Sequence, residues 1–156
     1  MRSKILIVED FADWRELLIG LLQREGHDVE AVDSLQAARD YLARTKDLDL
    51  AILDIRLVEP DEDNQDGMRL LSEIHRHQAL TRVIMVTGHG TMETQRKAFR
   101  EFQAFDFFRK EQFDSDEFRQ AVREAVESAH RDRQSRKGAD YIRDHRYKMW
   151  QQDQDN

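Results

Sequence analysis

Four short, largely apolar segments constrain the fold of this chain most. They cover residues 4–8, 48–53, 82–86 and 105–108, and few polar residues interrupt them. Runs of this kind, without a polar residue at every second position, are typical of strands buried on both faces of a parallel sheet. A more polar strand is expected at about residues 27–32. We therefore predict a sheet of five strands.

Segments with helical periodicity separate these strands. Their apolar residues recur at helical spacing in five places, around residues 14–22, 35–42, 68–74, 92–102 and 118–126. Ser34 is the expected N-cap of the second helix, and Gly26 is expected to end the first. Asp114 and Glu117 resemble a capping box before the last helix. Strands that alternate with helices predict an α/β fold with a parallel sheet.

The composition excludes several classes of protein. The 156 residues give room for one domain with a sizeable core, and 37% of them are charged. The sequence has no cysteine, which excludes disulfides, thiol chemistry and cysteine zinc sites. Its apolar runs are too short to span a membrane, and acidic residues follow the first strand at once, unlike a secretory signal. We expect a cytoplasmic protein that does not associate with a membrane.

The charge is distributed unevenly along the chain. Residues 129–156 carry seven basic and five acidic groups, whereas residues 1–128 carry a net charge of −9 within the total of −7. An acidic body argues against nucleic-acid binding and suits a cation site. The tail has too few large apolar residues for a core of its own. We expect a domain at 1–128 and a charged C-terminal extension at 129–156, either a helical continuation or a linker, without an output domain.

Chemically useful side chains follow four of the expected strands. Glu9 and Asp10 come after the first, Asp54 after the third, Thr87 ends the fourth, and Lys110 follows the fifth. The carboxyl ends of parallel strands meet at one edge of the sheet, which is where ligands bind in such folds. These five side chains are therefore expected to lie together.

Three carboxylates at one place repel one another, so either some of them are protonated or a hard cation lies among them. Two like charges about 4 Å apart cost about 4 kcal/mol at an effective dielectric of about 20. Oxygen ligands without cysteine or a histidine cluster indicate Mg²⁺. A divalent ion and the Lys110 ammonium would stabilise a transferring phosphoryl group, and a carboxylate is a competent nucleophile toward phosphorus. We interpret Asp54 as that nucleophile.

The order of these motifs resembles that of a known family, the receiver domains of two-component response regulators. The resemblance covers about residues 3–128, and it rests on Ile-Leu-Ile-Val-Glu9-Asp10, Ile-Leu-Asp54, Val-Thr87-Gly and Phe-Phe-Arg-Lys110. It implies a flavodoxin-like three-layer sandwich, with strand order 2-1-3-4-5 and five flanking helices. It also implies that Asp54 is phosphorylated by a histidine kinase or a phosphotransfer protein.

The resemblance assigns further roles by position. The Mg²⁺ ligands would be Asp10, Asp54 and the backbone carbonyl of Arg56, with Glu9 acting through water. Thr87 and Lys110 would grip the phosphoryl group. The switch residues would be Thr87 and Phe107, an aromatic side chain that turns inward on activation.

The implied function is a phosphorylation-controlled switch within a phosphorelay. It would signal through contacts with a downstream protein or a second copy of itself, and it would not act as an enzyme beyond slow self-dephosphorylation. One departure from the family is Glu111, which stands where proline usually follows the lysine. Because a cis peptide bond to a non-proline residue costs about 3 kcal/mol, we expect a loop of different shape here.

Other interpretations remain for each residue and for the whole. Asp10, Asp54 and Thr87 are also good helix caps, and Phe107 suits a plain core position. Lys110 would also suit an ordinary surface position. The chain as a whole would also suit a receiver-like scaffold that acts without phosphorylation. An aspartyl-nucleophile phosphatase is a further alternative, but it needs a second acid where Arg56 stands.

Overall fold

The computed structural model describes residues 2–58 and 63–155, and side chains as far as residue 136. Its five strands are parallel and are ordered β2-β1-β3-β4-β5 in one sheet, as predicted. The strands are β1 (Lys4–Val8), β2 (Asp28–Val32), β3 (Leu50–Leu53), β4 (Arg82–Thr87) and β5 (Asp106–Arg109). The helices are α1 (Ala12–Arg24), α2 (Leu35–Arg44), α3 (Asp66–His77), α4 (Met92–Arg100) and α5 (Ser115–Asp155), with a 3-10 turn at Lys110–Gln112.

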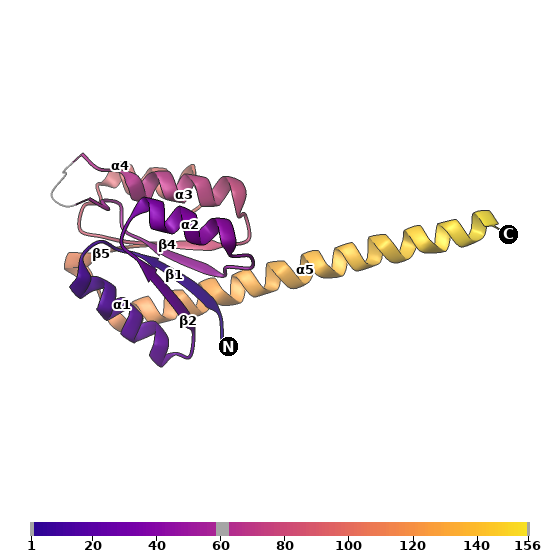
Figure 1. Cartoon of the computed structure of the whole chain (residues 1–156), viewed down its shortest axis with the longest axis horizontal. Coiled ribbons are helices and arrows are strands. Elements are labelled where there is room, and N and C mark those ends of the chain that lie inside the picture. Colours follow the sequence, from indigo (N-terminus) through magenta and orange to yellow (C-terminus); the bar gives the residue numbers. More distant parts are fainter. Residues whose placement is uncertain (1, 59–62, 156) are drawn as a thin grey trace.

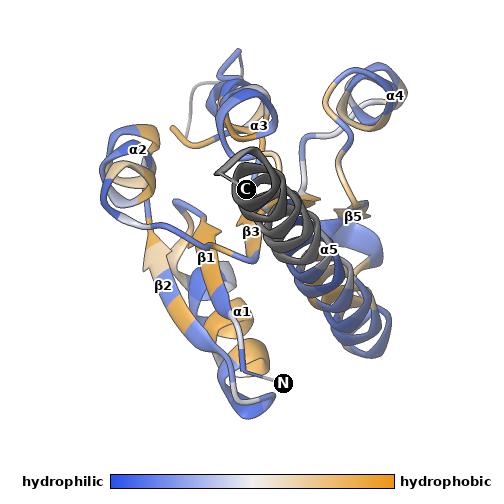
Figure 2. Cartoon of the chain, turned by 90° about the vertical axis from the view of Figure 1, so that its right-hand side faces the viewer, coloured by the Kyte–Doolittle hydropathy of each residue, from blue (hydrophilic) through white to orange (hydrophobic). Residues whose placement is uncertain are grey.

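The sheet is the middle layer of three. Helices α2, α3 and α4 cover one face, and α1 and α5 cover the other (Figure 2). In β1, Leu6 and Val8 pack toward the first group of helices, and Ile5 and Ile7 toward the second. All four side chains are fully buried. Because both faces are covered, the central strands are apolar throughout. Burial of each such side chain stabilises the folded state by about 1.5–3 kcal/mol.

Local sequence signals fix the ends of the elements. Ser34 caps α2 by accepting a hydrogen bond from the N–H of Ala37 at 3.2 Å. Gly26 follows α1 with a φ of +87°, a backbone conformation that favours glycine. Asp114 accepts the N–H groups of residues 116 and 117 at the start of α5. The polar strand β2 lies at the edge of the sheet, where burial is incomplete.

Helix α5 continues far beyond the sheet (Figure 1). Its first turns pack on the sheet through apolar residues as far as Ala129. Past that point an ion pair anchors it, because the Arg133 guanidinium binds the carboxylate of Asp49, which is 4% exposed. Asp49 also accepts the N–H of Lys4 at 2.9 Å and lies 3.3 Å from His130. Of the two expected forms of the extension, the structure shows the helical continuation.

The described helices include none that could cross a membrane, since no stretch among residues 2–58 and 63–155 is both long enough and apolar enough.

We predict that Arg133→Met lowers the free energy of unfolding by about 2 to 4 kcal/mol, because it leaves the buried Asp49 carboxylate without its guanidinium partner. Urea unfolding measures this. The control is Arg131→Met on the exposed side of the same helix, where a change within about 0.5 kcal/mol is expected. Equal losses in both variants would mean that the ion pair does not anchor the helix.

Candidate functional site

The five predicted side chains lie at the carboxyl edge of the sheet, and contacts join four of them. One carboxylate oxygen from each of Glu9, Asp10 and Asp54 lies within 4.8 Å of the others. Lys110 reaches the same place from the end of β5, because its ammonium donates to Glu9 Oε1 at 2.8 Å and to Asp54 Oδ2 at 2.9 Å. The arrangement joins residues that are 101 and 56 positions apart in the chain. The sequence therefore predicted correctly which acids and which lysine come together.

Two of the three carboxylates are held away from water, and Asp10 is partly exposed. Glu9 is 1% exposed and Asp54 is 2% exposed, because the apolar strands that carry them are covered on both faces. Burial, together with the charge of Asp54, raises the pKa of Glu9 to about 8. Burial lowers the pKa of Lys110, but the charges of Asp54 and Glu9 outweigh it, so the net shift is upward. Lys110 is therefore a permanent cation at neutral pH.

The donor set suits a hard divalent cation. Among the residues that the structure describes, Asp54 Oδ1 is buried and has no hydrogen-bond partner. A buried carboxylate oxygen without a partner is costly, and a metal ion would satisfy it. The cluster offers carboxylate oxygens only, which is the ligand type that Mg²⁺ prefers. The residues therefore fit Mg²⁺ better than zinc.

Thr87 lies beside the cluster at the end of β4 and is fully buried. Its Oγ1 accepts a hydrogen bond from the N–H of His89 at 3.1 Å, so its own O–H group can donate to a ligand oxygen. The His89 ring in turn contacts the guanidinium of Arg56. Two side chains that follow β3 and β4 thus meet beyond the carboxyl ends of these strands.

Phe107 lies in the core and is 9% exposed. Its ring centroid is 6.4 Å from that of Phe99 on α4. A Cβ on Gly90 would lie 2.7 Å from the ring, so the glycine provides the space that the ring occupies. The plain core interpretation of Phe107 agrees with this packing, and its role as a switch stays a prediction. The metal-ligand role of the Arg56 carbonyl also stays a prediction.

Two supporting residues escaped the sequence analysis. A Cβ on Gly67, the second residue of α3, would stand 1.7 Å from the backbone oxygen of Asp54, so only glycine fits there. Arg15 donates from Nη1 to the backbone oxygen of Glu9 at 2.9 Å and to that of Asp10 at 3.3 Å. In the sequence, Gly67 stands directly before the expected helix at 68–74, and nothing in the sequence indicates the contacts of Arg15.

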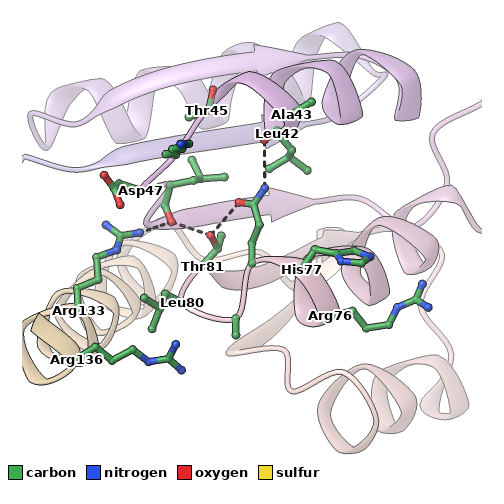
Figure 3. Close-up of a pocket in the computed structure, with 14 residues that line it drawn as sticks. Leu42, Ala43, Thr45, Asp47, Arg76, His77, Leu80, Thr81, Arg133 and Arg136 are labelled. Atoms are coloured by element: carbon green, nitrogen blue, oxygen red, sulfur yellow. Dashed lines mark hydrogen bonds between the residues drawn. The ribbon is translucent and has the colours of Figure 1, made fainter. Parts of the chain in front are cut away.

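A pocket of about 560 Å³ lies away from this site. It is lined by the residues at the ends of α2 and α3 and by Arg133 and Arg136 of α5 (Figure 3). There Arg133 and Thr81 both donate to the Leu48 carbonyl, at 2.6 Å and 2.8 Å. These contacts belong to the anchoring of α5. The pocket does not include the acidic cluster, where the Lys110 side chain fills the space between the carboxylates.

Comparison with known proteins shows the family of the chain. Residues 5–123 match the family model of the response regulator receiver domain. The chain is 38% identical over 109 residues to the response regulator protein PilR of Pseudomonas aeruginosa, a match that covers 70% of this chain and 23% of that protein. It is 34% identical over 110 residues to the nitrogen assimilation regulatory protein NtrX of Azorhizobium caulinodans, covering 70% and 23% of the two chains. The chain thus spans about a quarter of the length of these relatives.

Among solved structures, the receiver domain of NtrX from Brucella abortus superposes with a TM-score of 0.65 at 34% identity, covering 79% of this chain and 98% of that one. The receiver domain of a putative LuxO repressor protein from Vibrio parahaemolyticus gives a TM-score of 0.74 at 24% identity, covering 86% and 98%, and supports the fold. The chain belongs to the receiver domains of two-component response regulators.

We predict that Gly67→Ala destabilises the protein by about 2 kcal/mol or more, because the new methyl group collides with the backbone of Asp54. Urea unfolding measures the loss. The control is Gly20→Ala, where the structure leaves the space around an added Cβ open and the helix gains about 0.5–1 kcal/mol. A neutral Gly67→Ala would show that α3 is not packed against Asp54.

We predict that Mg²⁺ affinity rises with pH up to about 8, because binding displaces the proton that the raised pKa keeps on Glu9. Below that pH, each unit of acidification should weaken binding by up to about tenfold. A titration of Mg²⁺ at several pH values measures the slope, and Glu9→Gln should flatten it. A slope that persists unchanged in Glu9→Gln would assign the proton to another group.

Proposed function

We propose that Asp54 accepts a phosphoryl group and that the charge it brings switches the surface of the domain. The observation that carries this proposal is the pair of short contacts from Lys110 to Glu9 and Asp54, beside a buried Asp54 oxygen without a partner among the described residues. These charged groups are largely shielded from water. They are positioned to bind a tetrahedral phosphoryl group together with a metal cation.

The proposed transfer uses the phosphohistidine of a histidine kinase or a phosphotransfer protein. A carboxylate oxygen of Asp54 attacks phosphorus, an O–P bond forms, and the P–N bond breaks. The electron pair returns to the imidazole nitrogen, which takes up a proton. Bound Mg²⁺ would neutralise charge on the phosphoryl oxygens, held by Asp10, Asp54 and the Arg56 carbonyl, with Glu9 acting through water.

The neighbouring side chains would then hold the product. The Lys110 ammonium can exchange a carboxylate partner for a phosphoryl oxygen, and the Thr87 hydroxyl can donate to another. A phosphoryl group adds about −1.5 to −2 charges, which is enough to reorder these contacts. Phe107 lies one strand away from Thr87, on the partner strand β5, and would carry the change outward.

The output we propose is a protein contact. Receiver domains pass a change of surface to another protein or to a second copy, and the acidic body does not suit nucleic acid. The relatives are named regulators of which this chain spans only a part, so the downstream partner belongs to the proposal. Formation of a homodimer and a cytoplasmic location are also part of the proposal.

We also propose that self-dephosphorylation is slow. Arg56 stands two residues after Asp54 and contacts the His89 ring, and we expect this large cation to shield the phosphorylated Asp54 from water. A phosphatase built on an aspartyl nucleophile has less support, because Arg56 stands where such an enzyme needs its second acid.

We predict that the wild-type protein, given phosphoramidate and Mg²⁺, gains about one phosphoryl group per chain. Asp54→Asn should gain none, because an amide is not a nucleophile toward phosphorus. Phosphate-affinity electrophoresis measures the adduct, and Asp40→Asn, at an exposed position on α2, is the control for loss of an acid elsewhere. Continuous release of phosphate would favour the phosphatase, and an unlabelled wild type would favour a scaffold.

A further inference from the structure

Lys110 has a third partner besides the two carboxylates. Its ammonium lies over the ring of Trp14, with 5.2 Å between Nζ and the ring centroid. Trp14 belongs to the first turn of α1, which begins just after Glu9 and Asp10. The face of an aromatic ring attracts a cation, and the attraction strengthens where water is partly excluded. Only 14% of the Lys110 side chain is exposed.

The Trp14 ring is itself fixed by packing. It meets Phe113 edge to face, with centroids 5.2 Å apart and an angle of 88° between the planes. Phe113 packs in turn on Phe108 and on the fully buried Phe118 of α5. The N–H of Phe113 also donates to the Lys110 carbonyl at 3.3 Å, which closes the 3-10 turn. One aromatic cluster therefore fixes both the ring and the backbone of the lysine.

The backbone after Lys110 does little to direct the side chain. Glu111 follows instead of proline, so no ring restrains φ at that position. A lysine side chain has four rotatable carbons and loses much rotamer freedom when it is fixed. The position of the ammonium therefore depends on what the ammonium itself contacts.

Trp14 differs from the carboxylates because it is neutral. The attraction of Glu9 and Asp54 for Lys110 changes when a divalent cation or a phosphoryl group joins them, whereas the attraction of the ring does not. We propose that Trp14 is a positioning residue that keeps the Lys110 ammonium over Asp54 before and after phosphorylation. This inference rests on the proposed function and adds to it the residue that directs the lysine.

The test is a double-mutant cycle on the full chain. Trp14→Leu removes the aromatic ring, whereas Trp14→Phe keeps an aromatic ring at this position. Each substitution is made in the wild-type protein and in the Lys110→Met variant. With phosphoramidate and Mg²⁺, Trp14→Leu should lower the maximal rate of phosphorylation by about five- to thirtyfold. The half-saturating donor concentration should stay unchanged. Trp14→Phe should restore most of the rate, and in Lys110→Met the change at Trp14 should add nothing.

A matched pair elsewhere supplies the control. Arg44 lies over the Tyr41 ring at 5.6 Å on α2, away from the site. Tyr41→Leu removes a similar contact and should leave the rate unchanged. Equal losses from Trp14→Leu with and without Lys110 would overturn the inference, because they would reveal a general packing role. The absence of any loss would overturn it as well.

A spectroscopic measurement separates this inference from the proposed function. The chain has two tryptophans, so Trp150→Phe leaves Trp14 as the only indole that emits. Without any phosphodonor, Lys110→Met should change the emission of Trp14, and Tyr41→Leu should not. Unchanged emission in Lys110→Met would contradict the contact even if Trp14→Leu fails to fold. If the emission changes but the wild type cannot be phosphorylated, the proposed function fails and the contact stands.

Discussion

Acidic side chains placed where water cannot reach them are the constraint on which this structure depends. The apolar strands β1 and β3 bury Glu9 and Asp54 almost completely, and a buried pair of acids is unstable without a cation. Lys110 supplies that cation by binding both. The site is therefore stable without a ligand, and its side chains are already in place to bind a metal ion and a phosphoryl group. A metal ion would take over part of the neutralisation, and the lysine would then be available to a phosphoryl oxygen.

The rest of the fold holds these groups in place. Gly67 allows α3 to approach the backbone of Asp54, and Arg15 ties the first turns of α1 to the carbonyls that follow β1. At the opposite edge of the sheet, the pair of Asp49 and Arg133 anchors the helix that leads away from the domain. The two charged clusters thus lie at the two ends of one strand, β3. The acceptor site belongs to one end and the long helix to the other.

The fold and the acidic cluster could be predicted from the sequence because their signals are local. Apolar runs without alternation indicated covered strands, and the residue at each strand end could be read directly, as for Asp54 and Thr87. The strand order came with the resemblance to receiver domains, and the structure confirms it. The course of residues 129–156 stayed open, because their composition suits both a helix and a linker. The structure shows a helix. Its Arg133 binds Asp49, which lies 84 positions earlier in the chain.

The supporting contacts could not be predicted because they join distant segments. No spacing in the sequence places Trp14 over Lys110, or Gly67 against Asp54, since each pair meets only after the helices have packed on the sheet. Because Glu111 replaces the usual proline, the contacts of the Lys110 side chain itself determine where its ammonium lies. The roles of Thr87, Phe107 and the Arg56 carbonyl stay predictions.

Identification of the modified residue shows whether Asp54 is the nucleophile. After reaction with a phosphodonor and Mg²⁺, borohydride reduces an acyl phosphate to an alcohol, which converts a phosphorylated aspartate into homoserine. Peptide mass spectrometry then locates the change. We expect homoserine in place of Asp54, with Asp10 and Glu9 unaltered. Homoserine in place of Asp10, or an intact Asp54 in protein that carries phosphate, would contradict it.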